Sequence, residues 1–86
     1  MADKTAAEKK LILKKHYEMD EICEIMGYFD GSNEDVCTEE MDTLHAQAQR
    51  TNSAADWEKF DDRMLDAAII NGNFEEVIEN DVRYPL

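Results

Sequence analysis

The sequence predicts an all-α fold: a small bundle of three amphipathic helices with a short fourth helix near the C-terminal end. Helix-favouring Ala, Glu, Met and Leu are frequent, whereas the 86 residues include three glycines and one proline. Apolar residues recur at helical spacing in three long stretches, and capping or stop residues bound each stretch. A chain of this length is expected to form one domain, residues 1–86, with residues 1–5 and 81–86 flexible or extended.

The first helix is expected from about Ala6 to Met26. Thr5 and Glu8 have the spacing of a capping box, and Gly27 follows the last apolar position. One face of this helix collects the apolar residues that we expect in the core, namely Ile12, Met19, Ile22, Cys23 and Met26.

The second helix is expected from about Glu34 to Arg50, after a turn at residues 28–33. Ser32 or Asn33 is the expected N-cap, because short polar side chains accept hydrogen bonds from the first free amides of a helix. Its apolar stripe is narrow and consists of Cys37, Met41, Leu44 and Ala48, with His45 at the edge.

The third helix is expected from about Ala54 to Ile70, with Ser53 as N-cap and Asn71-Gly72 as the stop signal. A short fourth helix, Phe74 to Glu79, follows. The expected core residues of these two helices are Trp57, Phe60, Met64, Ala67, Ala68, Phe74, Val77 and Ile78.

The charge of the chain is strongly acidic and unevenly distributed. Five lysines in residues 1–15 give that stretch a balance of +3, which leaves −15 for residues 16–86 out of a net −12. No Lys or Arg occurs from His16 to Gln49, whereas ten acids fall between Glu18 and Asp42. Such a field repels nucleic acid and anionic membranes and attracts basic surfaces, so we expect no direct nucleic-acid or membrane partner.

The cellular setting is expected to be the cytoplasm. The Lys-rich start is followed by three apolar residues, too few for a signal peptide, and no stretch approaches the roughly 20 apolar residues of a membrane span. Two cysteines without a secretory signal favour free thiols, although a Cys23–Cys37 disulfide is geometrically allowed.

Enzymatic and metal-dependent functions are disfavoured. His16 and His45 are the only histidines, and neither stands in a pattern that supplies a nucleophile, a base and an orienting group. The acidic surroundings of the cysteines oppose thiolate formation. Zinc-type ligand pairs are absent, and the acidic stretch after Asp30 lacks the glycine and glutamate of a calcium loop. We therefore expect no catalytic residue, no metal and no cofactor.

The candidate binding residues are rows of acids that lie opposite the expected core faces. Asp35, Glu39 and Asp42 follow one another at spacings of four and three on the second helix, where like charges repel. Asp20, Glu21 and Glu24 do so on the first helix. Leu13 and Tyr17 fall on the same charged side and are expected to supply an apolar anchor, or else to pack against another helix or a second subunit.

These observations favour a non-enzymatic acidic interaction protein, an inhibitor that occupies the basic surface of a nucleic-acid-binding protein as a DNA mimic does. In size and charge alone, the chain is similar to the small acidic inhibitors that bacteriophages make against host nucleases and defence complexes. The alternative is a helical structural or regulatory oligomer, such as a homodimer or accessory subunit, joined through Leu13, Tyr17, Ile69 and Ile70.

Overall fold

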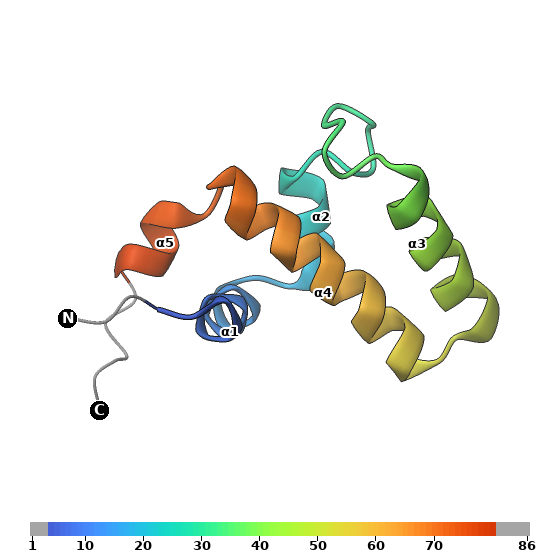
Figure 1. Ribbon diagram of the computed structural model, residues 1–86, viewed down its shortest axis with the longest axis horizontal. Helices are drawn as coiled ribbons and strands as arrows, with labels where there is room; N and C mark the ends of the chain where they lie inside the picture. Colours follow the sequence, from blue (N-terminus) through green and yellow to red (C-terminus); the bar gives the residue numbers. More distant parts are fainter. Residues whose placement is uncertain (1–3, 81–86) are drawn as a thin grey trace.

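The computed structural model describes residues 4–80, and this part of the chain is all-α and contains no strand (Figure 1). Its five helices are α1 (Ala6–His16), α2 (Met19–Ile25), α3 (Glu39–Thr51), α4 (Ala54–Asn71) and α5 (Glu75–Asn80). The long helix α4 lies at the centre: α1, α2 and α3 pack against it, and α5 packs against α1 (Figure 1). The all-α prediction is confirmed, whereas the expected three-plus-one arrangement is replaced by five helices, of which α4 is the central one.

The bounds of α4 agree closely with the prediction because both ends carry strong signals. Ser53 has the extended backbone of an N-cap, and Gly72 ends the helix in the left-handed region, with φ of +71°. The predicted core residues of this helix are buried except Trp57, which is partly exposed. Leu65, which lay outside the predicted stripe, is also buried. The short helix α5 begins within two residues of its predicted start.

The prediction of one continuous first helix is wrong. Tyr17 has an extended backbone, with φ of −136° and ψ of 148°, and it separates α1 from α2. Glu18 begins a new helix, and its N–H donates to Glu21 Oε1 at 2.9 Å. No glycine or proline marks this break, so it has no breaker signal in the sequence.

The second predicted helix begins five residues later than expected. Thr38 is the N-cap of α3, and its Oγ1 accepts a hydrogen bond from the N–H of Met41 at 3.1 Å. The preceding residues form a turn in which the N–H of Asp35 donates to Asn33 Oδ1 at 3.0 Å. The turn folds tightly over Gly27, whose φ is +77° and whose missing Cβ would lie 2.4 Å from Ser32 Oγ.

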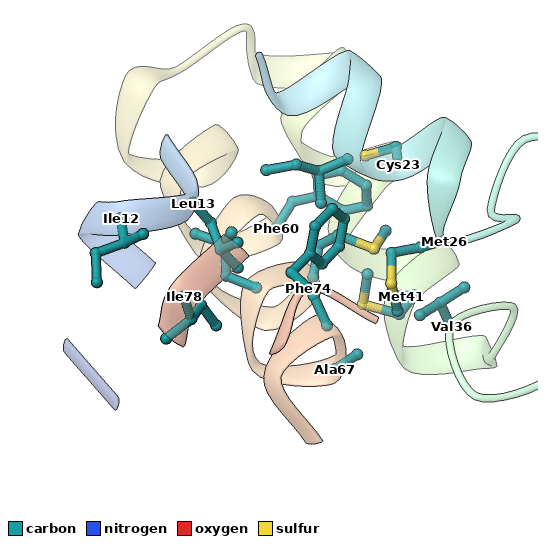
Figure 2. Close-up of a cluster of buried hydrophobic side chains, with 14 residues drawn as sticks. Ile12, Leu13, Cys23, Met26, Val36, Met41, Phe60, Ala67, Phe74 and Ile78 are labelled. Carbon is teal, nitrogen blue, oxygen red and sulfur yellow. The ribbon is translucent and has the colours of Figure 1, made fainter. Parts of the chain in front are cut away.

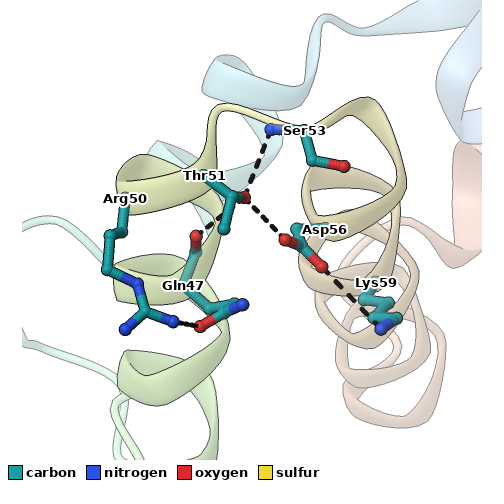
Figure 3. Close-up of polar contacts among 6 residues, drawn as sticks. All are labelled: Gln47, Arg50, Thr51, Ser53, Asp56 and Lys59. Carbon is teal, nitrogen blue, oxygen red and sulfur yellow. Dashed lines mark hydrogen bonds and ion pairs between the residues drawn. The ribbon is translucent and has the colours of Figure 1, made fainter.

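The connection between α3 and α4 is short and held by polar side chains (Figure 3). Thr51 Oγ1 lies 2.6 Å from Asp56 Oδ2 and accepts a hydrogen bond from the N–H of Ser53 at 3.3 Å. The hydrogen bond to Thr51 lowers the pKa of Asp56. Because Asn52 adopts the left-handed conformation, with φ of 50°, the chain reverses and α3 lies beside α4.

One hydrophobic core joins all five helices and the turn before α3 (Figure 2). Figure 2 shows side chains of α1, α2, α3 and α5 gathered around α4. The buried members are Ile12, Leu13, Ile22, Cys23, Met26, Val36, Met41, Phe60, Met64, Leu65, Ala67, Ala68, Phe74 and Ile78.

Cys23 and Cys37 are free thiols. Cys37 Sγ lies 3.5 Å from the carbonyl oxygen of Gly27, to which it donates a weak hydrogen bond. Within residues 4–80, no helix has both the length and the hydropathy required to cross a bilayer. The predicted flexible or extended ends fall mostly outside the described residues, although Thr5 is described and caps α1 as predicted.

Candidate functional site

The acidic segment, residues 18–42, comprises α2, the turn and the start of α3, and all ten of its carboxylate side chains are exposed. Among the residues that the structure describes, one ion pair involves this segment: Arg63 Nε lies 3.2 Å from Glu40 Oε1. Because the segment contains no Lys or Arg of its own, most of its carboxylates have no ion-pair partner within residues 4–80.

Three carboxylates of the segment accept hydrogen bonds from uncharged groups, and the first is Glu21, which accepts from the N–H of Glu18 at 2.9 Å. The side chain and backbone N–H of Ser32 lower the pKa of Asp30, and the N–H donates to Asp30 Oδ1 at 3.0 Å. The hydroxyl of Tyr28 donates to Asp42 Oδ1 at 3.0 Å. These contacts hold the carboxylates in place without cancelling their charge.

The acids on the α1 side of α4 are paired instead. Lys10 Nζ lies 2.7 Å from Asp62 Oδ1 and 2.7 Å from Asp66 Oδ1. Hydrogen bonds to these two carboxylates raise the pKa of Lys10. The molecule therefore has one side where opposite charges meet and another where carboxylates accumulate.

The acids predicted to bind a partner are all exposed, but they are not arranged as expected; they are Asp20, Glu21, Glu24, Asp35, Glu39 and Asp42. The first three lie on α2, and Glu39 and Asp42 lie in the first turn of α3. Asp35 lies in the turn before Thr38, so the prediction that Asp35, Glu39 and Asp42 form one helical row is wrong. The local hydrogen bond from the N–H of Asp35 to Asn33 replaces a helical one.

The prediction that Leu13 and Tyr17 lie on a charged surface is also wrong. Leu13 is 0% exposed and belongs to the core. The Tyr17 ring is partly buried and meets Phe74 edge to face, with centroids 5.1 Å apart. The break at Tyr17 turns both side chains inward, which agrees with the alternative that they pack against another helix.

A pocket of about 290 Å³ opens between α2, α3 and α4 beside the acidic segment. Aromatic rings form much of its lining: Phe29, His45, Trp57 and Phe60. Met19 and Cys23 of α2 add apolar surface. Burial raises the pKa of the Cys23 thiol to about 11, so this group is protonated and is not a nucleophile near neutral pH.

The rings of this pocket form a connected cluster. His45 lies 5.0 Å from Phe60 and 5.7 Å from Trp57 between ring centroids. Trp57 and Phe60 meet almost at right angles, 6.1 Å apart. The edge-to-face pairs of Trp57 with His45 and with Phe60 stabilise this arrangement of the lining.

Two carboxylates complete the pocket, Asp20 from α2 and Asp61 from α4. Partial burial raises the pKa of Asp61, as do the negative charges of Asp20 and Glu58, while the positive charge of Lys14 acts in the opposite direction. In residues 4–80 neither pocket carboxylate has an ion-pair partner within 4.0 Å or accepts a side-chain hydrogen bond. The pocket therefore combines aromatic surface with negative charge.

Sequence reasoning identified Asp20 among these residues and did not identify Phe29, His45, Trp57 or Asp61 as site residues. Trp57 fits the apolar stripe of its helix, which suggested a core residue, and Phe29 lies in a turn. No local signal marks their convergence. The described residues contain no group of three His, Cys, Asp or Glu side chains placed to hold a metal ion.

Comparisons with known proteins give no further identification. No family model, no curated protein and no solved structure matches this chain. Functional inference therefore depends on the site itself.

Proposed function

We propose that this protein is a non-enzymatic inhibitor that covers the Lys/Arg-rich surface of a nucleic-acid-handling protein in the manner of a DNA mimic. One observation carries the proposal: the acidic segment exposes ten carboxylates, and the described residues provide an ion pair for one of them, Glu40. A solubilising surface needs a net charge of only about 2–8 with both signs mixed, whereas this chain has −12 and separates its signs.

The physical basis is repulsion that a basic partner relieves. Like charges at neighbouring helical positions destabilise a helix by a few tenths of a kcal/mol each. A Lys/Arg-rich surface removes this repulsion. Its binding also releases the cations that gather around the carboxylates, as binding of a basic protein releases cations from the phosphate backbone of DNA. The negative field also steers a basic partner, so binding is fast and weakens as salt increases.

Anchoring supports the proposal because the backbone that carries the acids is held against the core. The segment is anchored in the core by Ile22 and Met26 of α2, Val36 of the turn and Met41 of α3. A preorganised surface loses little conformational entropy on binding. Small acidic inhibitors of bacteriophages are the class with which this proposal agrees, on size and charge.

The test uses immobilised protein and a bacterial extract. We expect a nucleic-acid-binding protein to be captured at low salt and released both by high salt and by added duplex DNA. The test variant combines Glu24→Gln, Asp35→Asn and Glu39→Gln, three exposed acids of the segment outside the pocket. It is expected to bind the captured protein at least about tenfold more weakly, since each lost charge pair contributes about 0.5–1 kcal/mol.

The matched control combines Glu75→Gln, Glu76→Gln and Glu79→Gln, three exposed acids of α5. Both variants change the net charge by the same amount, so the control separates a defined acidic surface from bulk charge. Equal binding by the two variants, or a captured protein that resists salt, would contradict the proposal.

The alternative, an oligomer joined through apolar residues, has fewer residues available than expected. Of its four candidates Leu13 is buried, Tyr17 packs on Phe74, Ile69 is partly buried, and Ile70 is 80% exposed. Three apolar residues that were not candidates are also exposed: Leu11, Ile25 and Phe29. Sedimentation equilibrium distinguishes the two functions: a dimer that Ile70→Asp dissociates supports the alternative, and a monomer at high concentration counts against it.

A further inference from the structure

We propose that the pocket between α2, α3 and α4 receives one arginine side chain of the basic partner. This inference rests on the proposed function and adds a specific contact to it: a single guanidinium seated between aromatic rings and the carboxylates of Asp20 and Asp61. The pocket, and not the acidic surface as a whole, would then select which basic protein is bound.

An arginine side chain combines a cationic group with an apolar methylene stem, and the pocket lining matches both. Aromatic rings attract cations within about 6 Å of the ring centroid, most strongly when the ring is Trp. Trp57, Phe60 and Phe29 supply such rings, and Met19 supplies polarisable apolar surface for the methylene stem of the side chain. A purely apolar ligand would leave the two carboxylates without a partner, so the lining disfavours it.

The charges of the pocket also favour a bound cation. Burial and the neighbouring carboxylates of Asp20 and Glu58 disfavour the ionised form of Asp61 and raise its pKa. Lys14 of α1 eases this repulsion without forming an ion pair within 4.0 Å in the described residues. A cation placed between Asp20 and Asp61 supplies the missing compensation. Such a ligand is bound partly because it removes a repulsion that the free protein carries.

Arginine fits better than lysine. Its guanidinium is planar, weakly hydrated, stacks on aromatic faces and donates to carboxylates in a fork. An ammonium group is compact and strongly hydrated, so moving it into a pocket with this much aromatic surface removes more hydration. The pocket volume of about 290 Å³ accommodates one such side chain and leaves no room for a folded segment.

The experiment uses a tripeptide with blocked ends, acetyl-Gly-Arg-Gly-amide, so that its only charge is the guanidinium. Trp57 is the single tryptophan of the chain and lines the pocket, so its emission and its indole amide signal report binding at this place. We expect a saturable change with the arginine peptide. Binding should be about tenfold weaker with citrulline, which keeps the shape without the charge, and weaker also with lysine.

Asp61→Asn and Asp62→Asn form a matched pair, since they remove the same charge from adjacent residues of α4. Asp61 lines the pocket, whereas Asp62 lies outside it and pairs with Lys10 of α1. Asp61→Asn is expected to weaken peptide binding at least about fivefold and Asp62→Asn less than about twofold. Asp20→Asn provides a second pocket variant, with the same expectation as Asp61→Asn.

The outcomes separate this inference from the proposed function. Absence of a saturable Trp57 response, an equal response to citrulline, or equal effects of the Asp61 and Asp62 substitutions would overturn the arginine pocket. A preference for the lysine peptide would also overturn it, in favour of an ammonium ligand. If capture of the partner still depends on Glu24, Asp35 and Glu39 in any of these cases, the proposed function stands without the pocket.

Discussion

The aspartates on the two sides of α4 have different surroundings. On the α1 side, Lys10 reaches across and pairs with Asp62 and Asp66, each at 2.7 Å, beside a core that includes Leu13 and Ile78. On the α2 and α3 side, Asp61 lines an aromatic pocket next to a segment whose ten acids have one ion pair among the described residues. Asp61 and Asp62 are neighbours in sequence, yet they belong to opposite sides of this division.

The difference indicates that residues which stabilise the fold and residues available for binding lie in different parts of this small domain. Paired charges and a closed core contribute to the free energy of unfolding, whereas carboxylates that repel one another lower it. The α1 side is therefore expected to tolerate changes in its exposed residues and to be sensitive in its core. The α2 and α3 side is expected to lose binding when its charges are removed, with little loss of stability.

The largest expected effect tests the closed side. Leu13→Ala removes a side chain that is 0% exposed and should reduce the free energy of unfolding by about 2–5 kcal/mol through the cavity that it leaves. Leu11→Ala is the matched control on the same helix, because Leu11 is 57% exposed, and it should change stability by less than about 0.5 kcal/mol. Urea unfolding followed by circular dichroism measures both.

This pair of variants also decides between the two positions assigned to Leu13. If Leu13 lay on an exposed, charged side of one continuous helix, as the sequence suggested, its replacement by alanine would cost no more than that of Leu11. Similar effects of the two substitutions would therefore argue against the break at Tyr17 and against the closed core on this side.

An intermediate effect is expected at Tyr28, whose ring meets those of His45 and Phe60 and whose hydroxyl ties the turn to α3. Burial, and then the hydrogen bond to Asp42, raise the pKa of Tyr28 from 10 to about 12. The unfolded chain therefore releases this proton first, so the stability that Tyr28 contributes is complete below pH 10 and is lost as the pH rises toward 12. The expected loss is at most about 2 kcal/mol.

Tyr28→Phe isolates this effect from the general repulsion of an acidic chain at high pH. The variant should lose the hydrogen bond to Asp42 at neutral pH, at a cost of about 1 kcal/mol, and should show a flatter decline in stability between pH 10 and 12. Tyr17→Phe, on the closed side, keeps Tyr28 and should decline as the unaltered protein does. Parallel curves for all three proteins would contradict the assignment.

The fold was predictable where local signals are strong and not where packing decides. Ser53 and Gly72 mark both ends of α4, and the predicted bounds differ from the observed ones by one residue. At Tyr17 no local signal exists: the chain breaks because an extended Tyr17 packs on Phe74 while Leu13 enters the core. Periodicity cannot reveal such a break, since it describes one helix at a time.

The site was predictable in its charge but not in its geometry. The absence of Lys and Arg from His16 to Gln49 indicated an acidic surface, and its carboxylates are exposed. The pocket, by contrast, depends on how α2, α3 and α4 pack together, which brings Asp20 and Asp61 to one place across 41 positions of sequence. Trp57 looked like a core residue because rings that line a pocket and rings that fill a core have the same spacing along a helix.

The smallest expected effect on stability is the one that separates the two sides most directly. The folded state raises the pKa of Asp61, chiefly through burial. Ionised Asp61 therefore lowers the free energy of unfolding near neutral pH, and this destabilisation is relieved as the pH falls toward the ordinary pKa of an aspartate. Asp61→Asn should therefore stabilise the protein at neutral pH by about 0.5 kcal/mol, the size of a neighbouring like-charge repulsion.

Asp62→Asn is the control: it removes an ion pair with Lys10 and should be neutral or destabilising by a similar amount. Thermal unfolding of both variants at neutral pH measures the sign. A gain in stability at Asp61 together with weaker binding of the arginine peptide would show that this carboxylate is retained for a ligand and not for the fold, whereas a loss at both positions would place Asp61 on the structural side of the division.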